Sequence, residues 1–505
     1  MSNVTPTSSV WRHILRIFSG PLACALVFAL PSPEGLDPRG VKCVAAAIWI
    51  ILWWMTDAFP IALTSLFGLL LYAMMGVLPL VKGFAFFGNP SIILLLGAML
   101  LLGVWKESNL IARYAYWAVT MPWVDGRPMR LLAVFGIAAG LLSALVPNIP
   151  VAMLFVSIAV AMAKGMKVEQ GQPLFRALCL SSGVASALGG AGTPIGGAPN
   201  LVVVGVISSS LGYQIQFWEW TALGLPMSIG WLVVMVFLCW FFFIRHGCAF
   251  SPRDDGNTCV PLDSVMERMR ALGPVTRHEH IAMAVMLLAL LLWSFGPPAA
   301  RALGLPELAG LLGAPFVAVL AGMSLFFIPL KKNDATGNIT FAMNWKQGLS
   351  AINWDIIIFV TGALAFGQML IDGGVDKWLA GLIGGMLEGM SPTMIWLILM
   401  TVSGLVSQCF SNVAVISLLL PVTAALAQRY GLNPVVTCLT VGMVANVGIM
   451  FPFSSPPTAA TLMEAEGYVS ARDFLRFSLP MLILASLIAM LTGVTLGALV
   501  FPMPA

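Results

Sequence analysis

The chain has 505 residues, of which 59% are hydrophobic and only 9% are charged, and its formal net charge is +4. Soluble domains usually carry about 25% charged residues, so this composition predicts a polytopic membrane protein and excludes an ordinary soluble domain. The small positive charge is scattered along the chain, so we expect no nucleic-acid partner.

Apolar stretches long enough to cross a membrane recur from one end of the chain to the other. A spanning helix needs about 20 residues to cross roughly 30 Å of hydrocarbon. Because lipid offers no hydrogen-bond partner for a free backbone amide, we expect an all-α fold embedded in the lipid bilayer. The stretches are 41–56, 61–80, 130–163, 201–211 with its flanks, 221–244, 280–295, 307–330, 393–427 and 474–501.

The two ends of the chain predict its orientation. Arg12, His13 and Arg16 precede the segment "LACALVFALP", which favours a cytoplasmic N-terminus. No small-residue cleavage pattern follows this segment, so we interpret it as the first membrane helix and not as a signal peptide. The tail "GALVFPMPA" has no cation and is expected outside. These features predict a multi-pass protein of the inner (cytoplasmic) membrane of a bacterium.

Two halves of the chain resemble each other. A polar stretch at 245–280 separates them, and a shorter polar connector occupies 331–348. Two repeats with interrupted apolar segments at matching positions indicate the binding site of a secondary transporter. The spacing alone does not decide whether the repeats are inverted. Four pairs of matching residues lie 264 positions apart: Asn89 and Asn353, Gly103 and Gly367, Ser143 and Ser407, and Asn148 and Asn412.

Each half begins with an apolar block that has polar residues at its start and glycines near its middle. We predict a re-entrant helical hairpin at 86–113 and another at 352–385, because each arm is shorter than the about 20 residues of a spanning helix. Such hairpins are tolerated where they are buried in protein or line water. A pair of short spanning helices is the alternative.

Each half then places an Asn inside a long apolar run, Asn148 within 130–163 and Asn412 within 393–427. Prolines on both sides of Asn148 disfavour a continuous helix, and Ser and Asn at 411–412 favour a helix N-cap. We therefore predict two broken helices, each with a second part that begins just past the Asn. Free N–H groups at such a helix start attract an anion. A satisfied Asn at an ordinary kink is the alternative. The upstream hydroxyls that would join the Asn at a cation belong to Ser143 and Ser407.

A Gly/Pro-rich segment follows in each half. "GGAGTPIGGAPN" at 189–200 cannot form a continuous helix, and 450–459 is its counterpart. Unwound backbone carbonyls of this kind coordinate Na⁺ in transporters. A phosphate-binding loop is a poor alternative because no Gly-Lys-Ser/Thr follows.

The remaining polar residues carry less information. The eight cysteines show no CxxC spacing and are expected to be small buried hydrophobes. His278-Glu279-His280 is expected to be solvated surface, with a metal cluster as the alternative. Asp57 and Asp355 lie near segment ends, where a helix cap is expected and an ion relay is the alternative. The membrane segments contain no nucleophile–base pair and no set of metal ligands, so we predict no catalytic residue, no transition-metal site and no enzyme.

Five stretches together resemble the divalent anion:sodium symporter family, whose members carry dicarboxylates, citrate or sulfate. They are "WWMTDAFPIALTSL", "GNPSIILLLGAMLL", "GTPIGGAPNLVVVG", "NWDIIIFVTGALAFG" and "SNVAVISLLLPV". The resemblance covers roughly residues 40–500. It implies inverted repeats, two re-entrant hairpins, a scaffold domain, a moving transport domain, a homodimer and an elevator mechanism. It also implies Na⁺ as the coupling ion and no organic cofactor.

The signature of that family is a Ser-Asn-Thr triplet in each repeat, which this chain changes to Pro147-Asn148-Ile149 and Ser411-Asn412-Val413. Both Asn are kept and both Thr are aliphatic. A hydrogen bond to a charged group contributes about 1.5–3 kcal/mol, so we expect a typical C4-dicarboxylate to bind less well. The resemblance implies substrate contacts at Asn148, Ile149, Ser411, Asn412, Val413, Thr193, Pro457 and Thr458. It implies Na⁺ contacts at Ser143, Asn148, Gly192, Gly196, Ser407, Asn412, Ser454 and Ser455.

The expected domain organisation follows from the repeats and the resemblance. Scaffold helices occupy 1–85 and, with the polar connectors, 212–350. The transport domain comprises 86–211 and 351–470, and a C-terminal helix occupies 471–505.

The sequence thus predicts a secondary active transporter that couples Na⁺ to a small anion by an elevator mechanism. The anion is expected to be a di- or tricarboxylate or a related organic anion, with sulfate as another possibility. A Na⁺-independent anion exchanger of the same fold is the nearest alternative. A channel or an intramembrane enzyme is more distant.

Overall fold

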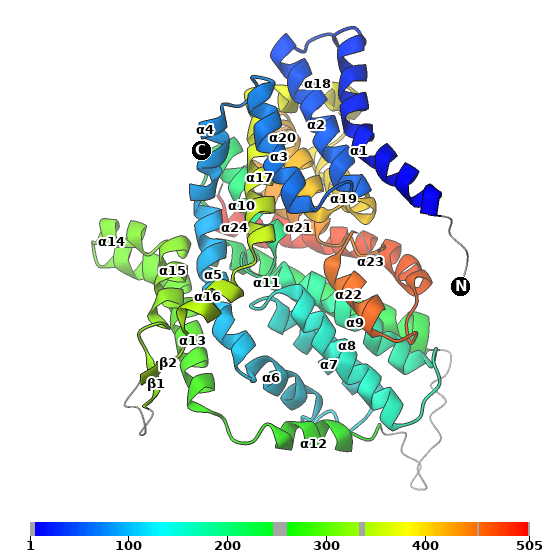
Figure 1. Cartoon of the computed structure of the whole chain (residues 1–505), viewed down its shortest axis with the longest axis vertical. Helices are drawn as coiled ribbons and strands as arrows, with labels where there is room; N and C mark the ends of the chain where they lie inside the picture. The colour runs from blue at the N-terminus through cyan, green and yellow to red at the C-terminus, as the bar shows by residue number, and fades with distance from the viewer. Residues whose placement is uncertain (1–5, 246–259, 333–338, 452–453, 503–505) are drawn as a thin grey trace.

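The structure is a computed structural model that describes the backbone of residues 6–245, 260–332, 339–451 and 454–502. Part of the polar stretch 245–280, which includes two of the eight cysteines (Cys248 and Cys259), and Pro452 of the segment 450–459 lie outside these ranges. The described residues form helices and one short antiparallel hairpin, β1 (Pro329–Lys332) with β2 (Ile339–Phe341). Nine of the described helices are long and apolar enough to cross a membrane. The expected polytopic all-α fold is confirmed (Figure 1).

The first half contains α1 (Pro6–Ala29), α2 (Pro38–Thr56), α3 (Ile61–Met74), α4 (Leu80–Phe84), the 3₁₀ turn η1 (Ala85–Gly88), α5 (Pro90–Glu107), α6 (Leu110–Val119), α7 (Pro128–Ser143), α8 (Asn148–Gly165), α9 (Pro173–Gly190), α10 (Ala198–Leu211), α11 (Phe217–Cys239) and the π-helical turn η2 (Trp240–Ile244). The second contains α12 (Asp263–Ala271), α13 (Arg277–Ala302), α14 (Pro306–Leu311), α15 (Ala314–Ser324), α16 (Trp345–Ala351), α17 (Trp354–Asp372), α18 (Val375–Leu387), α19 (Pro392–Cys409), α20 (Asn412–Arg429), α21 (Pro434–Ala445), α22 (Pro456–Glu464), α23 (Ala471–Thr492), the π-helical turn η3 (Gly493–Gly497) and α24 (Ala498–Val500).

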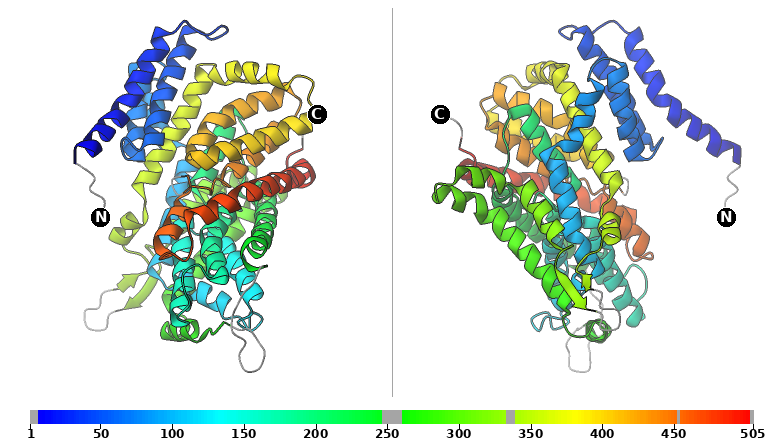
Figure 2. Two further views of the ribbon diagram at one scale, coloured as in Figure 1. Left: turned by 90° about the vertical axis from the view of Figure 1, so that its right-hand side faces the viewer. Right: turned by 60° about the vertical axis from the view of Figure 1, so that its left-hand side comes forward.

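The internal repeat is visible in the helix boundaries. Helices α5, α7 and α8 each begin 264 positions before α17, α19 and α20, respectively. The two copies run in opposite directions: α5 descends from α4 to α6 in Figure 1, whereas α17 rises from α16 to α18 at the top. Figure 2 shows the same opposition from two other sides. The repeats are therefore inverted.

The structure corrects the predicted hairpins at 86–113 and 352–385. Helices α5 and α17 run without a break through the glycines that suggested a turn. Those glycines allow neighbouring helices to pack closely against α5 and α17. A Cβ on Gly97 would lie 2.5 Å from the backbone of Ala318, and one on Gly362 would lie 2.6 Å from the Cβ of Ser65. The residues mark close helix packing, which sequence periodicity does not distinguish from a turn.

The hairpins lie instead at 130–163 and 393–427, where we predicted broken helices. Helices α7 and α8 both pack along α9, and α19 and α20 both pack along α21. If α7 and α8 formed one straight helix with a break, they would together be about twice as long as α9 and could not both pack along it. The same holds for α19 and α20 on α21, so the chain must reverse direction at each Asn. The predicted helix start just past each Asn is confirmed to within one residue, because α8 begins at Asn148 and α20 begins at Asn412. The predicted direction of the chain across the break is wrong.

The broken helices are α9–α10, interrupted over 191–197, and α21–α22, between which the described residues 446–451 and 454–455 are non-helical. The first Gly/Pro segment, 189–200, is not a continuous helix, as expected: 191–197 are non-helical, and the residues on either side belong to α9 and α10. The last part of 450–459 already belongs to α22. The second half-helix of each pair packs on the other repeat. Helix α10 contacts α20 and α21, and α22 contacts α8 and α9. This reciprocal exchange locks the two repeats into one unit.

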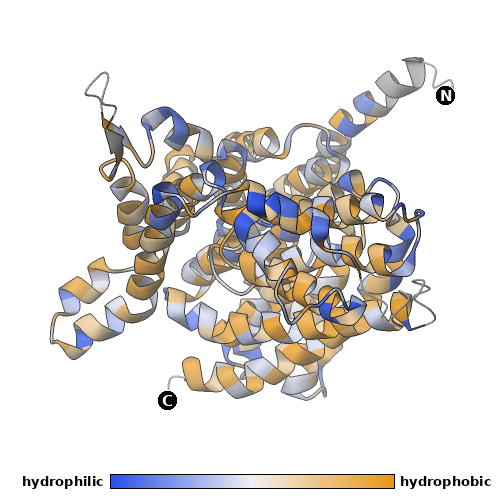
Figure 3. Ribbon diagram, turned by 90° about the horizontal axis from the view of Figure 1, so that it is seen from below, coloured by the Kyte–Doolittle hydropathy of each residue, from blue (hydrophilic) through white to orange (hydrophobic). Residues whose placement is uncertain are grey.

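The described residues 260–280 of the first polar connector pack against the rest of the protein. Glu279 is 1% exposed and forms an ion pair with Arg113, with 3.1 Å between Oε1 and Nε. His278 and His280 do not converge on a common site, since their ring nitrogens lie 2.9 Å from the carbonyls of Ala342 and Thr276. Hydrophilic residues gather on short helices and loops at the end of the molecule seen in Figure 3, and hydrophobic residues cover much of the surrounding helices.

The two membrane-edge aspartates occupy helix ends. Asp57 is the C-cap of α2 with a left-handed backbone, φ 47°, and Asp355 lies in the exposed first turn of α17. Both positions agree with the expected capping or helix-end role.

Candidate functional site

The first hairpin places Ser143 and Asn148 together at its tip. Ser143 ends α7 and Asn148 begins α8, and the Ser143 hydroxyl donates to Asn148 Oδ1 over 2.7 Å. Gly190 of α9 lies against the Asn148 side chain, where a Cβ would overlap Oδ1. Gly196 approaches the Gly190 carbonyl in the same way. Oxygen atoms from three separate segments therefore surround this tip.

The second hairpin repeats the arrangement with one difference. Ser407 is buried, and its hydroxyl donates to the Ala445 carbonyl over 2.6 Å. Asn412 Oδ1 is buried and has no hydrogen-bond partner among the described residues. A Cβ on Gly448 would lie 2.7 Å from that oxygen and would also overlap Ser407 Oγ. An unpartnered carbonyl oxygen beside a hydroxyl costs free energy unless a ligand satisfies it.

A pair of amide side chains joins the two broken helices beside their interruptions. Asn446 donates from Nδ2 to Asn200 Oδ1 over 3.1 Å. Asn200 Nδ2 in turn donates to the carbonyls of Gly190 and Thr193, each at 2.8 Å. Thr193 donates its hydroxyl to the Ala144 carbonyl at the first hairpin tip. Thr193 therefore serves as a brace between loop and tip, and its only hydroxyl proton is already committed.

A third amide holds the second loop. Gln408 is 1% exposed and donates to the Val447 carbonyl at 2.9 Å. Its Oε1 accepts from the amides of Ile449 and Met450 at 3.1 and 2.9 Å. Asn200, Asn446 and Gln408 were not singled out from the sequence. The signal that selected Asn148, an amide side chain inside an apolar run, would have found all three.

Four helices begin at this centre with their N-terminal amides uncapped by their own N-cap side chain. They are α8, α10, α20 and α22, with N-cap residues Pro147, Gly197, Ser411 and Ser455. At the opposite ends of the same motifs, side chains of Gln172, Ser391 and Asn433 cap the starts of α9, α19 and α21, and only α7 begins without a side-chain cap. Free N–H groups and the positive end of the helix dipole form an anion-binding environment.

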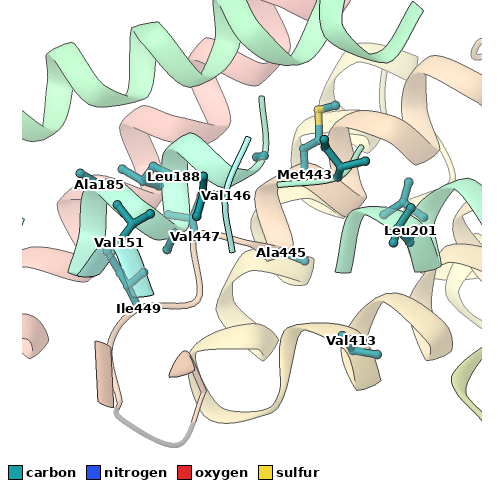
Figure 4. Packing of buried hydrophobic residues seen from close by; sticks show 14 of the residues in the cluster. Val146, Val151, Ala185, Leu188, Leu201, Val413, Met443, Ala445, Val447 and Ile449 are labelled. Carbon is teal, nitrogen blue, oxygen red and sulfur yellow. The ribbon is translucent and has the colours of Figure 1, made fainter. Parts of the chain in front are cut away.

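The two aliphatic residues that replace the family threonines lie in different surroundings. Ile149 is 40% exposed, whereas Val413 is 4% exposed. Val413 belongs to the buried hydrophobic cluster of the protein. In Figure 4 it lies on its own helix, apart from Val146 and Val447, which lie close to each other. Val413 therefore fills the protein interior and presents no open surface to a ligand.

The second loop buries its polar residues. Ser454 donates to the Gly448 carbonyl at 3.2 Å, and Ser455 and Pro457 are both buried. Thr458 is fully buried, and its hydroxyl has no partner among the described residues. Gly192 lies on the other loop, where its amide donates to the Gly189 carbonyl at 2.9 Å.

Comparison with known proteins places this arrangement in a family. Residues 9–503 match the family model described as the sodium:sulfate symporter transmembrane region. The chain belongs to the divalent anion:sodium symporter family. It is 30% identical over 457 residues to the sodium-dependent dicarboxylate transporter SdcS of Staphylococcus saprophyticus, covering 88% of this chain and 84% of that protein. It is 26% identical over 473 residues to the protein of the same name from Staphylococcus aureus, covering 91% and 86%.

Members of the family are membrane transporters and not enzymes. Two solved structures share the fold at low identity. The YdaH transporter of Alcanivorax borkumensis aligns with a TM-score of 0.55 and 16% identity over 97% of both chains. The MtrF structure from Neisseria gonorrhoeae aligns with a TM-score of 0.51 and 12% identity over 97% and 95%. These likenesses support the polytopic fold alone.

Proposed function

We propose that this protein is a Na⁺-coupled symporter for a small organic anion in the inner membrane of a bacterium. Relatives that match most of the chain are sodium-dependent dicarboxylate transporters. The observation that carries the proposal is the buried, unpartnered Asn412 Oδ1 beside Ser407 at an uncapped helix start. That group of atoms suits a cation and an anion side by side.

The cation part uses oxygen ligands from each hairpin and its loop. Ser407 and Asn412 would hold one Na⁺ with help from carbonyls near Gly448, and Ser454 and Ser455 lie in the loop that follows. Hard oxygen donors at unwound helices are the ligands that transporters use for Na⁺. When bound, Na⁺ supplies positive charge next to the carried anion.

The first cation position is less complete. Asn148 Oδ1 already accepts the Ser143 hydroxyl, and Pro147 replaces a residue that would offer a hydroxyl. We propose that Ser143, Asn148, Gly192 and Gly196 surround this second, weaker Na⁺ position. A bound ion there would require the Ser143 hydroxyl to rotate, so that its lone pair and not its proton faces the ion.

The anion part relies on backbone. We propose that a carboxylate lies at the starts of α8 and α20, close to Asn148, Ile149, Ser411 and Asn412. The starts of α10 and α22, near Thr193, Pro457 and Thr458, contribute positive dipole ends. Because Thr193 and Val413 have no free polar atom to offer, we expect fewer side-chain bonds to the carboxylate than a Ser-Asn-Thr pair would give.

We infer which helices form the moving transport domain from the contacts between helices. Helices α7–α10 and α19–α22 form the interlocked unit that would move, as in an elevator. Helix α5 packs on α15, and α17 packs on α3, so we now assign α5 and α17 to the scaffold and not to the transport domain. A homodimer through scaffold helices, a cytoplasmic N-terminus and an external C-terminus complete the proposal.

Purified protein in proteoliposomes tests the function. Uptake of radiolabelled succinate, citrate and sulfate is measured with an inward Na⁺ gradient and with an equal choline gradient. We expect at least one organic anion to accumulate only with Na⁺, and Asn412→Ala to abolish that accumulation. Uptake that depends on internal anion and ignores Na⁺ would replace the symporter with an exchanger. Single-channel currents would indicate a channel.

A further inference from the structure

A pocket lies between α2 and the tip of the second hairpin. We propose that it receives an apolar group carried by the transported anion, so that the preferred substrate is a carboxylate with a short alkyl branch. This inference rests on the proposed function and names its substrate class more narrowly. The pocket is lined mainly by apolar side chains, to which the polar residues of the proposed site assign no role.

One face of α2 forms the first wall of the pocket. Ile51, Trp54 and Met55 line it at helical spacing. The Trp54 indole N–H already donates to Ser65 Oγ over 3.3 Å, and its ring packs edge-on against Phe359 with 5.7 Å between centroids. Trp54 is therefore held in place and offers the pocket an apolar surface without a free donor.

The second hairpin forms the other wall. Phe410 and Val415 contribute apolar surface, and Ser411 is the only polar side chain that lines the pocket among the described residues. Ser411 is also the N-cap of α20 and immediately precedes Asn412. The polar end of the pocket is thus the same helix start at which we place the carboxylate.

Because the pocket opens at the proposed carboxylate position, we infer that it holds a part of the same substrate molecule. A carboxylate bound at the start of α20 would have its carbon skeleton beside Ser411, and a branch on that skeleton would point toward Phe410 and Trp54. A polar branch would lose its water without gaining a partner there, which is unfavourable. An apolar branch would gain from burial.

The size of the pocket limits the branch. Its volume is about 90 Å³. A space of this size accommodates a short alkyl branch and not a long chain. Burying each methylene contributes about 0.8 kcal/mol, which corresponds to roughly a fourfold gain in affinity per carbon.

A homologous series of probes tests the inference on the full-length wild-type protein. Succinate, 2-methylsuccinate, 2-ethylsuccinate, 2-propylsuccinate and 2-hexylsuccinate compete with labelled substrate for Na⁺-driven uptake in proteoliposomes. We expect the half-inhibiting concentration to fall roughly fourfold per carbon up to propyl, and the hexyl compound to lose part of that gain. Equal inhibition along the series would overturn the inference, and so would the absence of binding by every member.

A pocket-filling variant locates the effect. Ala414 lines the pocket, and Ala414→Leu should remove the preference for propylsuccinate over succinate. Ala302→Leu, at an exposed position of α13, is the matched control and should keep it. An unchanged preference in Ala414→Leu would contradict the assignment. If that variant fails to fold, the wild-type series still decides.

Two failures remain distinguishable. A lipid chain that occupied the pocket would leave no dependence on branch length, and only the narrower inference would fail. Uptake that ignored Na⁺ for every anion would remove the symporter proposal, whatever the order of affinities.

Discussion

Asn446 of the second repeat donates a hydrogen bond to Asn200 of the first, with 3.1 Å between Nδ2 and Oδ1. Both side chains are buried, at 6% and 1% exposure. The bond joins the first turn of α10 to the end of α21, beside the interruptions of the two broken helices. Asn200 also donates to the carbonyls of Gly190 and Thr193. The pair therefore connects the surroundings of the first hairpin tip and the second loop through one network of hydrogen bonds.

We expect unequal losses when this pair is broken. Asn446→Ala leaves one buried acceptor without a partner, which costs about 1–3 kcal/mol. Asn200→Ala leaves the Gly190 carbonyl and the Asn446 amide without these partners, and the Thr193 carbonyl keeps only its bond from the Gly196 amide, so its loss of unfolding free energy should be larger. Thermal unfolding in detergent measures both. The double variant should be less destabilised than the sum of the single variants because the residues are coupled. Strict additivity would show that the bond does not matter.

The two signature asparagines should respond differently to alanine. Asn412 Oδ1 makes no hydrogen bond, so Asn412→Ala should leave stability without Na⁺ nearly unchanged. A polar contact with a charged group contributes about 1.5–3 kcal/mol. Loss of the contact between Asn412 Oδ1 and Na⁺ should therefore raise the half-saturating Na⁺ concentration roughly tenfold or more. Asn148→Ala should also lower stability without Na⁺, since it removes the bond from Ser143. Both variants should abolish transport.

Thermal shift against NaCl, with choline chloride holding ionic strength constant, separates these effects. The Na⁺-dependent rise in unfolding temperature should shrink in Asn412→Ala. A titration identical to wild type would remove Asn412 from the cation site, and wild-type uptake in either variant would remove that residue from the binding site.

Gly97 provides a test of close helix packing. Gly97→Ala would place a methyl group 2.5 Å from the backbone of Ala318, and backbone cannot move aside as a flexible side chain can. Overpacking of this kind typically costs about 1–3 kcal/mol. Gly385→Ala is the matched control, because no atom lies within 4 Å of its Cβ position and alanine favours a helix by up to about 1 kcal/mol. The unfolding temperature should fall in the first variant and hold or rise in the second.

Asp376 predicts a pH-dependent stability. Burial raises the pKa of this carboxyl in the first turn of α18, and its Oδ1 has no hydrogen-bond partner among the described residues. A raised acid pKa means that ionisation costs stability once the pH passes the unfolded value of about 3.9, and that the loss is complete above the folded pKa. Asp376→Asn should therefore be more stable than wild type at pH 7.

The advantage of Asp376→Asn should disappear as the pH falls below about 4, because wild type is then protonated in both states. Unfolding temperatures from pH 4 to pH 8 measure this difference. Asp355→Asn, at an exposed helix start, should show no comparable gain. A constant difference between wild type and Asp376→Asn across the range would contradict a role for ionisation.

Local chemistry made part of the site predictable. Proline and Ser/Asn propensities placed helix starts at Asn148 and Asn412, and glycine and proline placed the interruption after Gly190. The same reasoning misplaced the hairpins. A broken helix and a helical hairpin have the same helix-breaking residues at the interruption, because both leave the same backbone amides free. The sequence therefore does not show whether the chain continues in the same direction or reverses. Gly97 and Gly362 likewise indicate either a turn or a tight contact.

The sequence by itself determined that this protein is helical, embedded in lipid and built from two copies of one motif, because lipid forbids unpaired backbone and the matching residues recur at one spacing. Only the tertiary structure decided which segments reverse and which half-helices exchange between repeats. It also decided that Val413 is buried while Ile149 is not. Those outcomes depend on contacts between residues far apart in the chain, such as Asn200 with Asn446, and no local pattern encodes which distant partner a side chain will meet.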